Sequence, residues 1–176
     1  GVALIGPLFF VARLANALEK LGVRRGDRVA TFAWNNARHM ELYLAVPCMG
    51  AVLHPLNLRL PGDQLAYIVN HAEDQVVFVD TTLLPAVEKL APELKCVKHY
   101  VIMDDKVPAD CKLESVYAYE ELLNAASPDY PWPHLDENDA AGMCYTSGTT
   151  GHPKGVVYSH RSIMLHCLGL TMADSL

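Results

Sequence analysis

The sequence has little that would support a disulfide-stabilised fold or a cysteine-based metal site. Its 176 residues include five cysteines, an odd number, and no two of them form a CxxC pair. This spacing fits neither a disulfide framework nor a zinc site. The cysteine pattern therefore favours a reducing, cytoplasmic environment.

Long hydrophobic runs and an excess of basic residues are also missing. No apolar run reaches the roughly 18–20 residues that a membrane-spanning helix needs. The apolar stretch at residues 1–12 lacks the basic start of a signal peptide. The chain carries 14 Lys and Arg against 20 Asp and Glu, a formal net charge of −6. This balance argues against a nucleic-acid partner, because proteins that wrap nucleic acid normally present a basic face.

The composition is that of an ordinary globular domain. Hydrophobic residues make up 51% of the chain and charged residues 19%, which excludes an intrinsically disordered segment. The length is sufficient to bury a sizeable core.

Helical and strand-like patterns alternate along the chain. The spacing of Leu14, Leu18 and Leu21 predicts a helix that ends at Gly22, where a positive φ is favourable. A second helix is expected to be capped at residues 35–36, with an apolar face formed by Met40, Tyr43, Leu44 and Pro47. Further helices are predicted near residues 61–69, 83–90, 119–125 and 160–172, and strands at 28–33, 51–54, 76–79, 97–103, 140–146 and 155–159. This alternation predicts an α/β fold with a doubly wound, mainly parallel sheet.

Residues 143–159 contain a polar, glycine-rich loop between two predicted strands. Glycines allow a backbone to turn tightly and to point several N–H groups at one ligand. Hydroxyl groups add donors, and a lysine adds a point charge for phosphate. Such a loop suits a polyanion, and a nucleoside triphosphate fits best. The candidate residues are Thr146, Ser147, Gly148, Thr149, Thr150, Gly151 and Lys154.

Two common phosphate-binding motifs are absent from this loop. A Walker A motif needs a Ser or Thr after its lysine, whereas Gly155 follows Lys154; this opposes a phosphotransferase or GTPase. The dinucleotide fingerprint GxGxxG is missing as well, and a strand follows Gly155 where that fingerprint requires a helix. From composition alone, a simple surface turn stays an equal alternative.

The complete string at residues 145–155, YTSGTTGHPKG, resembles the AMP-binding signature of the adenylate-forming superfamily. That superfamily includes acyl-CoA synthetases, aryl-CoA ligases, firefly luciferase and the adenylation domains of peptide synthetases. The resemblance extends over residues 13–172. Segments 38–41, 50–54, 57–60 and 157–161 are most similar to bacterial medium- to long-chain fatty acyl-CoA synthetases.

The resemblance implies a two-step ligase reaction. A fatty acid carboxylate attacks the α-phosphate of ATP to give acyl-adenylate and pyrophosphate, and the thiol of coenzyme A then displaces AMP. Carried over by position, the seven candidate residues named above contact the β- and γ-phosphates, and the hydroxyl of Thr146 lies nearest Mg²⁺. On sequence grounds a capping role for Thr146 is equally open.

The resemblance also implies that residues 1–176 form a partial N-terminal AMP-binding domain. The family's adenine motif, its ribose-binding Asp and its C-terminal domain with the adenylation lysine have no counterpart here, so we assign no catalytic residue and expect no turnover by this chain alone. Residues 1–10 do not resemble the family and are interpreted as altered or vector-derived. A sheet that ends this early is expected to expose apolar surface.

Two alternatives stay open at this point. The acid could be aryl or short-chain, since the acyl pocket lies mostly beyond residue 176, or the chain could be a non-catalytic nucleotide-binding module. The family suggests a cytoplasmic enzyme that touches membranes to collect its substrate, and the oligomeric state is open, a homodimer included. Trp34 and Trp132 are expected to be core or interface aromatics, and Cys144 an inert packing residue of an apolar strand.

Overall fold

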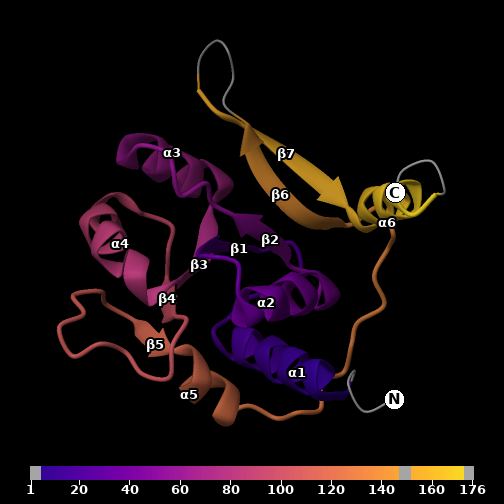
Figure 1. Ribbon diagram of the computed structural model, residues 1–176, viewed down its shortest axis with the longest axis horizontal. Helices are drawn as coiled ribbons and strands as arrows, with labels where there is room; N and C mark the ends of the chain where they lie inside the picture. Colours follow the sequence, from indigo (N-terminus) through magenta and orange to yellow (C-terminus); the bar gives the residue numbers. More distant parts are fainter. Residues whose placement is uncertain (1–4, 147–151, 173–176) are drawn as a thin grey trace.

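In the computed structural model, residues 5–146 and 152–172 are described. Within these residues, seven strands form one sheet in the order β5-β4-β3-β1-β2-β6-β7 (Figure 1). The strands are β1 (Arg28–Phe32), β2 (Val52–Pro55), β3 (Asp74–Val79), β4 (His99–Ile102), β5 (Val116–Ala118), β6 (Ala140–Thr146) and β7 (Lys154–Ser159). The helices are α1 (Ile5–Lys20), α2 (Ala37–Cys48), α3 (Gly62–Ala72), α4 (Leu84–Leu90), α5 (Tyr119–Asn124) and α6 (His160–Leu170), with 3-10 turns at Thr81–Leu83 and Ala91–Glu93.

The sheet confirms the predicted fold class. Strands β1 to β6 pair in parallel, and β7 pairs with β6 in antiparallel fashion. The short strand β5 was not predicted. Its three residues add to β4 at the edge of the sheet, and such a short segment carries too little periodicity to be recognised.

Helices cover both faces of the sheet and define two hydrophobic clusters. One cluster joins α1, α2 and α5 to residues such as Val29 and Phe78. The other joins α3 and α4 to residues such as Ala30 and Val77. Neighbouring strand residues therefore point to opposite faces, as a doubly wound sheet requires.

The α1 prediction is confirmed in its packing and in its end. Leu14 and Leu18 are buried, and Gly22 has φ +90° just beyond the helix. A glycine adopts this conformation without the steric cost that a Cβ would bring.

The predicted inner face of α2 is wrong. Met40 is 61% exposed, and Tyr43 and Leu44 are 46% and 41% exposed. The buried residues of the helix are His39, Leu42, Ala45 and Val46. Both sides of α2 carry apolar residues, and the side with the smaller residues packs between α1 and the sheet, where space is limited. Pro47 lies in the last turn, and the helix ends one residue later at Cys48.

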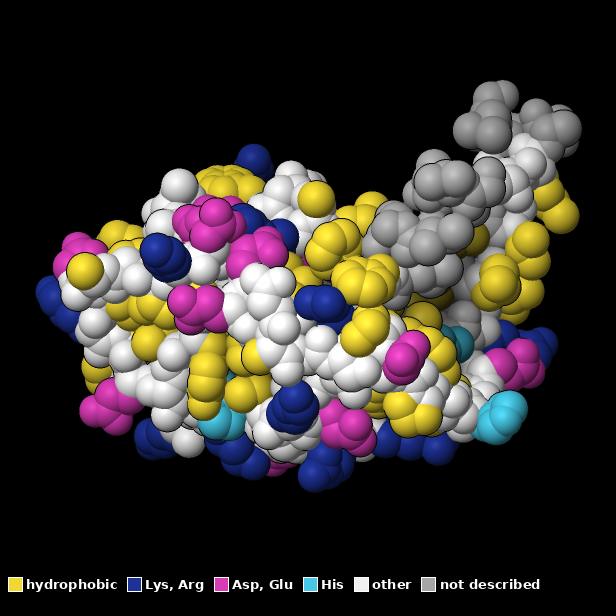
Figure 2. Space-filling view, turned by 90° about the horizontal axis from the view of Figure 1, so that it is seen from below, with side chains coloured by type: hydrophobic (Ala, Val, Ile, Leu, Met, Phe, Trp, Pro, Cys, Tyr) yellow, Lys and Arg dark blue, Asp and Glu magenta, His cyan; other side chains and the backbone are white. Residues whose placement is uncertain are grey.

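The β6–β7 hairpin and α6 extend away from the rest of the molecule (Figure 1). No residue of α6 is buried, and the residues of β7 are exposed up to Ser159. Figure 2 shows hydrophobic side chains along the part that projects at the upper right, where α6 lies, and interspersed acidic and basic side chains over the rest of this face. The expected apolar surface is therefore present.

Trp34 and Trp132, expected to be core or interface aromatics, are not core residues, and Cys144, expected to pack within an apolar strand, is exposed. Trp34 is 52% exposed and Trp132 is 43% exposed, and Cys144 is an exposed free thiol. Trp34 lies just beyond the end of β1, and Cys144 lies within β6, in which Ala141 is the one buried residue, so their apolar surroundings in sequence do not translate into burial. Among the described helices, none is both long and apolar enough to cross a membrane.

Candidate functional site

The β6–β7 hairpin brings the two ends of the predicted phosphate loop together. Thr146 ends β6, Lys154 begins β7, and the two residues are direct partners in the antiparallel register. Both side chains are exposed. Ser147, Gly148, Thr149, Thr150 and Gly151, the other predicted phosphate contacts, lie outside the described residues. The structure thus places Thr146 and Lys154 opposite each other on neighbouring strands at the end of the hairpin.

This hairpin end lies at the edge of the sheet where the parallel strands have their carboxyl ends. Strand β6 runs parallel to β2, with Leu53 opposite Gly142. In open α/β sheets, ligands bind at this edge. A cavity of about 290 Å³ adjoins it, between α3 and the hairpin. Its lining comprises Asn57, Leu60, Gln64, Ile68, Tyr145, Thr146 and Pro153.

Aromatic and histidine side chains connect the hairpin end to α3. The hydroxyl oxygen of Tyr145 lies 2.6 Å from Nδ1 of His71, and the ring of Tyr67 stacks on that of His152 with centroids 4.6 Å apart. Burial raises the pKa of the Tyr145 phenol, and the nearby Asp74 carboxylate raises it further. Tyr145 therefore acts as a neutral hydroxyl donor at neutral pH.

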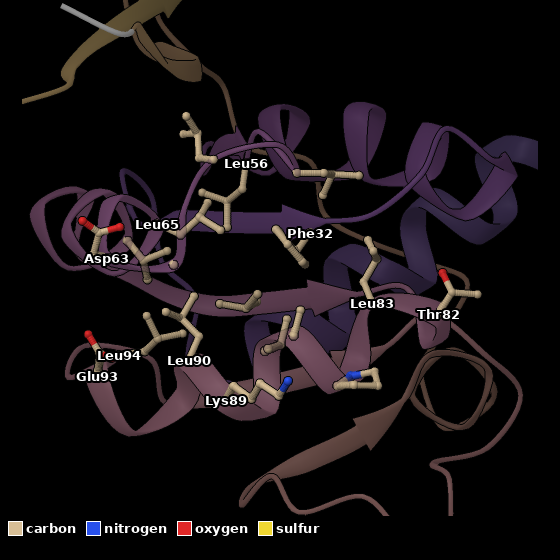
Figure 3. Close-up of a pocket in the computed structure, with 18 residues that line it drawn as sticks. Phe32, Leu56, Asp63, Leu65, Thr82, Leu83, Lys89, Leu90, Glu93 and Leu94 are labelled. Carbon is tan, nitrogen blue, oxygen red and sulfur yellow. The ribbon is translucent and has the colours of Figure 1, made fainter.

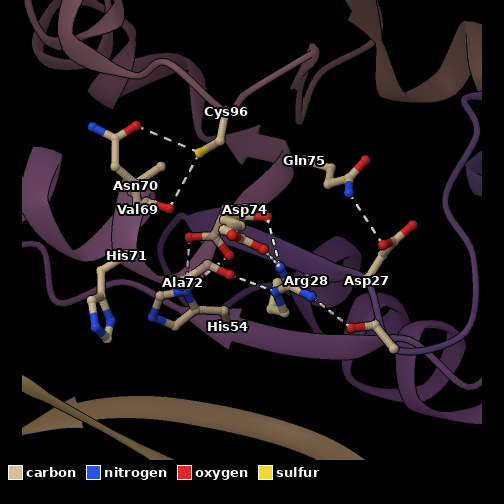
Figure 4. A network of polar contacts seen from close by, with 12 residues as sticks. Asp27, Arg28, His54, Val69, Asn70, His71, Ala72, Asp74, Gln75 and Cys96 are labelled. Carbon is tan, nitrogen blue, oxygen red and sulfur yellow. Dashed lines mark hydrogen bonds and ion pairs between the residues drawn. The ribbon is translucent and has the colours of Figure 1, made fainter.

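A buried histidine–carboxylate pair lies beneath Tyr145. Nδ1 of His54 lies 2.8 Å and 3.0 Å from the two carboxylate oxygens of Asp74 (Figure 4). The side chains of His54 and Asp74 are 1% and 0% exposed. Burial raises the pKa of Asp74, and the hydrogen bond from His54 opposes that rise. The ring of His54 packs against Tyr145 at 5.3 Å between centroids.

These supporting residues were not predicted from the sequence. Each precedes the hairpin residue that it supports by 71 to 91 positions in the chain, and no short motif contains them: these residues are His54, Tyr67, His71 and Asp74. The only local signal is the periodicity of α3, which assigns its buried residues to the core but says nothing about Tyr67 and His71 on another face.

A second, larger cavity of about 650 Å³ lies between α3 and α4 (Figure 3). Leucine side chains dominate its lining, among them Leu56, Leu65 and Leu90. Lys89 is accompanied there by Asp63 and Glu93. This apolar cavity does not have the positive charge that a triphosphate needs.

The donor groups of the hairpin end fit a nucleotide-bound Mg²⁺ better than a metal caged by protein. Within the described ranges, no group of three or more His, Cys, Asp or Glu side chains could hold a metal ion. Mg²⁺ commonly retains waters and binds through substrate phosphates together with one or two protein oxygens. The exposed hydroxyl of Thr146 is suited to that role.

The chain matches a known protein family over almost its whole length. The family model described as AMP-binding enzyme covers residues 10–175. A long-chain-fatty-acid–CoA ligase of Thermus thermophilus is 52% identical over 162 residues, and a medium-chain-fatty-acid–CoA ligase of Ectopseudomonas oleovorans is 47% identical over 165 residues. These matches cover 92% and 93% of this chain.

The fold also matches solved structures of such enzymes. The structure of the anthranilate CoA ligase AuaEII in complex with anthranoyl-AMP superimposes with a TM-score of 0.84 at 23% identity, over 94% of this chain and 31% of that one. At this identity the likeness concerns the fold alone. The chain spans 28% and 30% of the length of the two curated relatives named above.

Proposed function

Because the chain belongs to the AMP-binding enzyme family, we propose that it is the ATP-binding portion of a fatty acid–CoA ligase. In the proposed reaction a fatty acid carboxylate attacks the α-phosphate of ATP, forming acyl-adenylate and releasing pyrophosphate. The sulfur of coenzyme A then attacks the acyl carbonyl and AMP leaves. The long-chain and medium-chain fatty acid ligases at 52% and 47% identity support this class of acid.

The observation that carries the proposal is the pairing of Thr146 with Lys154 at the end of the β6–β7 hairpin. The intervening signature residues, Ser147 to Gly151, are bounded by a hydroxyl on one strand and an ammonium group on the other. A carboxylate and a triphosphate repel each other, so the enzyme must spread the phosphate charge over donors before the two can align.

Each residue has a specific role in the proposal. Lys154 places a positive charge beside the β- and γ-phosphates, and Thr146 offers its hydroxyl oxygen toward the cation that accompanies them. When bound, Mg²⁺ would neutralise developing charge on the phosphate oxygens. Backbone N–H groups and hydroxyls of residues 147–151 would supply further donors.

In this proposal residues 1–176 form the N-terminal part of a larger AMP-binding domain, with residues 1–10 altered or vector-derived. The binding sites for adenine, for coenzyme A and for most of the acyl chain would then lie in the rest of the complete protein. In that case this chain does not turn over by itself, and activity must be measured with the complete protein.

Carboxylate-dependent ATP–pyrophosphate exchange by the complete protein tests the proposal. We expect exchange with hexadecanoate and octanoate to exceed exchange with acetate or an aryl acid. Preference for acetate or an aryl acid would support the adenylation reaction but would assign the enzyme to short-chain or aryl acids instead of fatty acids. Absence of exchange in a folded protein that binds ATP would instead support a non-catalytic nucleotide-binding module.

Lys154→Ala tests the phosphate site itself. Loss of one charged hydrogen-bond donor to phosphate should reduce kcat/KM for ATP about 10- to 100-fold. Lys106→Ala is the matched control, because Lys106 is an exposed lysine in the segment between β4 and β5, at the opposite end of the strand order. Equal kinetics for the two variants would contradict the assignment of Lys154.

A further inference from the structure

We propose that Tyr67 and His71 of α3 are positioning residues that hold Thr146 and Lys154 in place for the nucleotide, acting through Tyr145 and His152. This inference rests on the proposed function of the hairpin end. Neither residue touches a phosphate in the proposal; each holds a neighbour of one that does.

The first contact fixes the β6 side of the hairpin. Nδ1 of His71 lies 2.6 Å from the hydroxyl oxygen of Tyr145, and a neutral imidazole with its proton on Nε2 accepts the hydroxyl proton at this distance. The two rings also meet edge to face, with centroids 5.9 Å apart. Because Tyr145 directly precedes Thr146, its position determines where the Thr146 hydroxyl lies.

The second contact fixes the β7 side. The ring of Tyr67 lies nearly parallel to that of His152, with an interplanar angle of 22° and centroids 4.6 Å apart. His152 precedes Lys154 by two residues. Tyr67 also stacks on His71, at 5.3 Å, as residues four apart on a helix can. One face of α3 therefore holds both sides of the hairpin end.

The surroundings of Tyr145 are built to admit its ring. Gly155 is the register partner of Tyr145, and a Cβ at residue 155 would lie 3.1 Å from Cζ of Tyr145 and 3.3 Å from its hydroxyl oxygen. A side chain there would push the ring away from His71. From the other side the ring packs on His54, which the buried Asp74 holds in turn (Figure 4).

The pairing of the strands leaves this part of the hairpin dependent on α3. Strand β6 has one register pair with β2, Leu53 opposite Gly142, so the last residues of β6 have no ladder partner on that side. Tyr67 and His71 belong to neither hydrophobic cluster, and His71 is exposed. Their contacts thus contribute to the location of the hairpin end more than to the core.

A double-mutant cycle in the complete protein tests this inference. His71→Leu and Tyr145→Phe each remove the same hydrogen bond, and Tyr145→Phe keeps the ring on His54. Each should raise KM for ATP in the exchange reaction about 3- to 10-fold while KM for the fatty acid stays unchanged. The effect of the double variant should be smaller than the sum of the two single effects, because both single variants remove the same hydrogen bond, while His71→Leu alone also removes the ring contacts of His71. His71→Asn, whose side-chain oxygen can accept the same proton, should restore much of the ATP affinity.

Matched controls come from the opposite edge of the sheet. His99 and Tyr117 form an edge-to-face pair at 5.7 Å between β4 and β5, so His99→Leu and Tyr117→Phe should leave both KM values unchanged. The inference is overturned if the His71 and Tyr145 variants behave like these controls. It is also overturned if their effects add fully, or if KM for both substrates rises together with a fall in thermal stability. Absence of exchange by the unmodified protein would instead refute the proposed function.

Discussion

His39 is a buried imidazole with a partner on each ring nitrogen. Its Nε2 lies 2.9 Å from the hydroxyl oxygen of Thr31, and its Nδ1 lies 3.2 Å from the carbonyl oxygen of Trp34. The carbonyl can only accept, so Nδ1 donates to it and Nε2 accepts from Thr31. Burial lowers the pKa of His39, and the hydrogen bond to Trp34 opposes that effect in part. The native site therefore favours the neutral ring.

This arrangement predicts a loss of stability in mild acid. The pKa of His39 in the folded chain lies below its unfolded value of about 6.5. The neutral His39 ring therefore contributes its full stabilisation above about pH 6.5, and this stabilisation is lost as the pH falls through the folded pKa. The unfolding free energy of the chain, measured with urea at pH 7 and pH 5, should therefore fall toward pH 5. His39→Gln should be less stable at pH 7 but should lose less on acidification. An equal loss in both proteins would contradict the prediction.

Single residues show which parts of the hairpin end can be recognised in the sequence. Thr146 and Lys154 were singled out because a contiguous signature contains both, and their contact with phosphate stays a prediction. Tyr67 and His71 were not, since their contact with Tyr145 and His152 arises only when α3 and the hairpin meet in space. A linear motif specifies the groups that bind a ligand, but the residues that position them come from distant parts of the chain.

At the scale of elements, the helices α2 and α6 have the same kind of cap in different surroundings. The side chain of Asn36 accepts a hydrogen bond from the backbone N–H of His39, at 2.9 Å, and Ser159 accepts one from Ser162, at 3.1 Å. Helix α2 buries four residues, whereas α6 buries none. The same interaction should therefore affect global stability in one case and local order in the other.

Two alanine variants test this difference. Asn36→Ala should lower the free energy of unfolding by about 1 kcal/mol, seen as a lower urea midpoint with an unchanged slope. Ser159→Ala serves as its matched counterpart: the urea midpoint should hardly move, while amide hydrogen exchange within α6 becomes faster. A comparable shift of the midpoint in both variants would show that α6 unfolds together with the core.

The elements were predictable to different degrees for physical reasons. Strand β3 was recognised because a strand buried on both faces gives a continuous apolar run at residues 76–79. The inner face of α2 was not, because Met40 and Leu42 are equally apolar and only the neighbouring elements decide which of them is buried. Periodicity predicts that a helix exists; packing decides its rotation.

The whole molecule exposes more surface than its mass requires. Its accessible surface is 10197 Å², whereas a compact monomer of 19.4 kDa has about 8,500 Å². Much of the exposed apolar surface lies on β7, on α6 and just after α6, in Val157, Tyr158, Ile163, Met164, Leu165, Leu168, Leu170 and Met172. Exposed apolar surface of this extent is typical of a site that binds protein, membrane or ligand, or of a surface that aggregates.

The proposed domain organisation makes a differential prediction for this surface. Met164 and Leu168 lie four residues apart on α6 and are 61% and 53% exposed. In the 176-residue chain, Met164→Gln with Leu168→Gln should reduce binding of an apolar dye and self-association in light scattering, with little change in the urea midpoint. In the complete protein the same pair should destabilise by about 2 kcal/mol per residue, because further chain would bury those side chains. The control Lys106→Ala, at an exposed lysine, should change neither the dye binding and self-association of the 176-residue chain nor the stability of the complete protein. If the double variant is equally harmless in both proteins, nothing covers α6, and residues 1–176 would not be part of a larger packed domain.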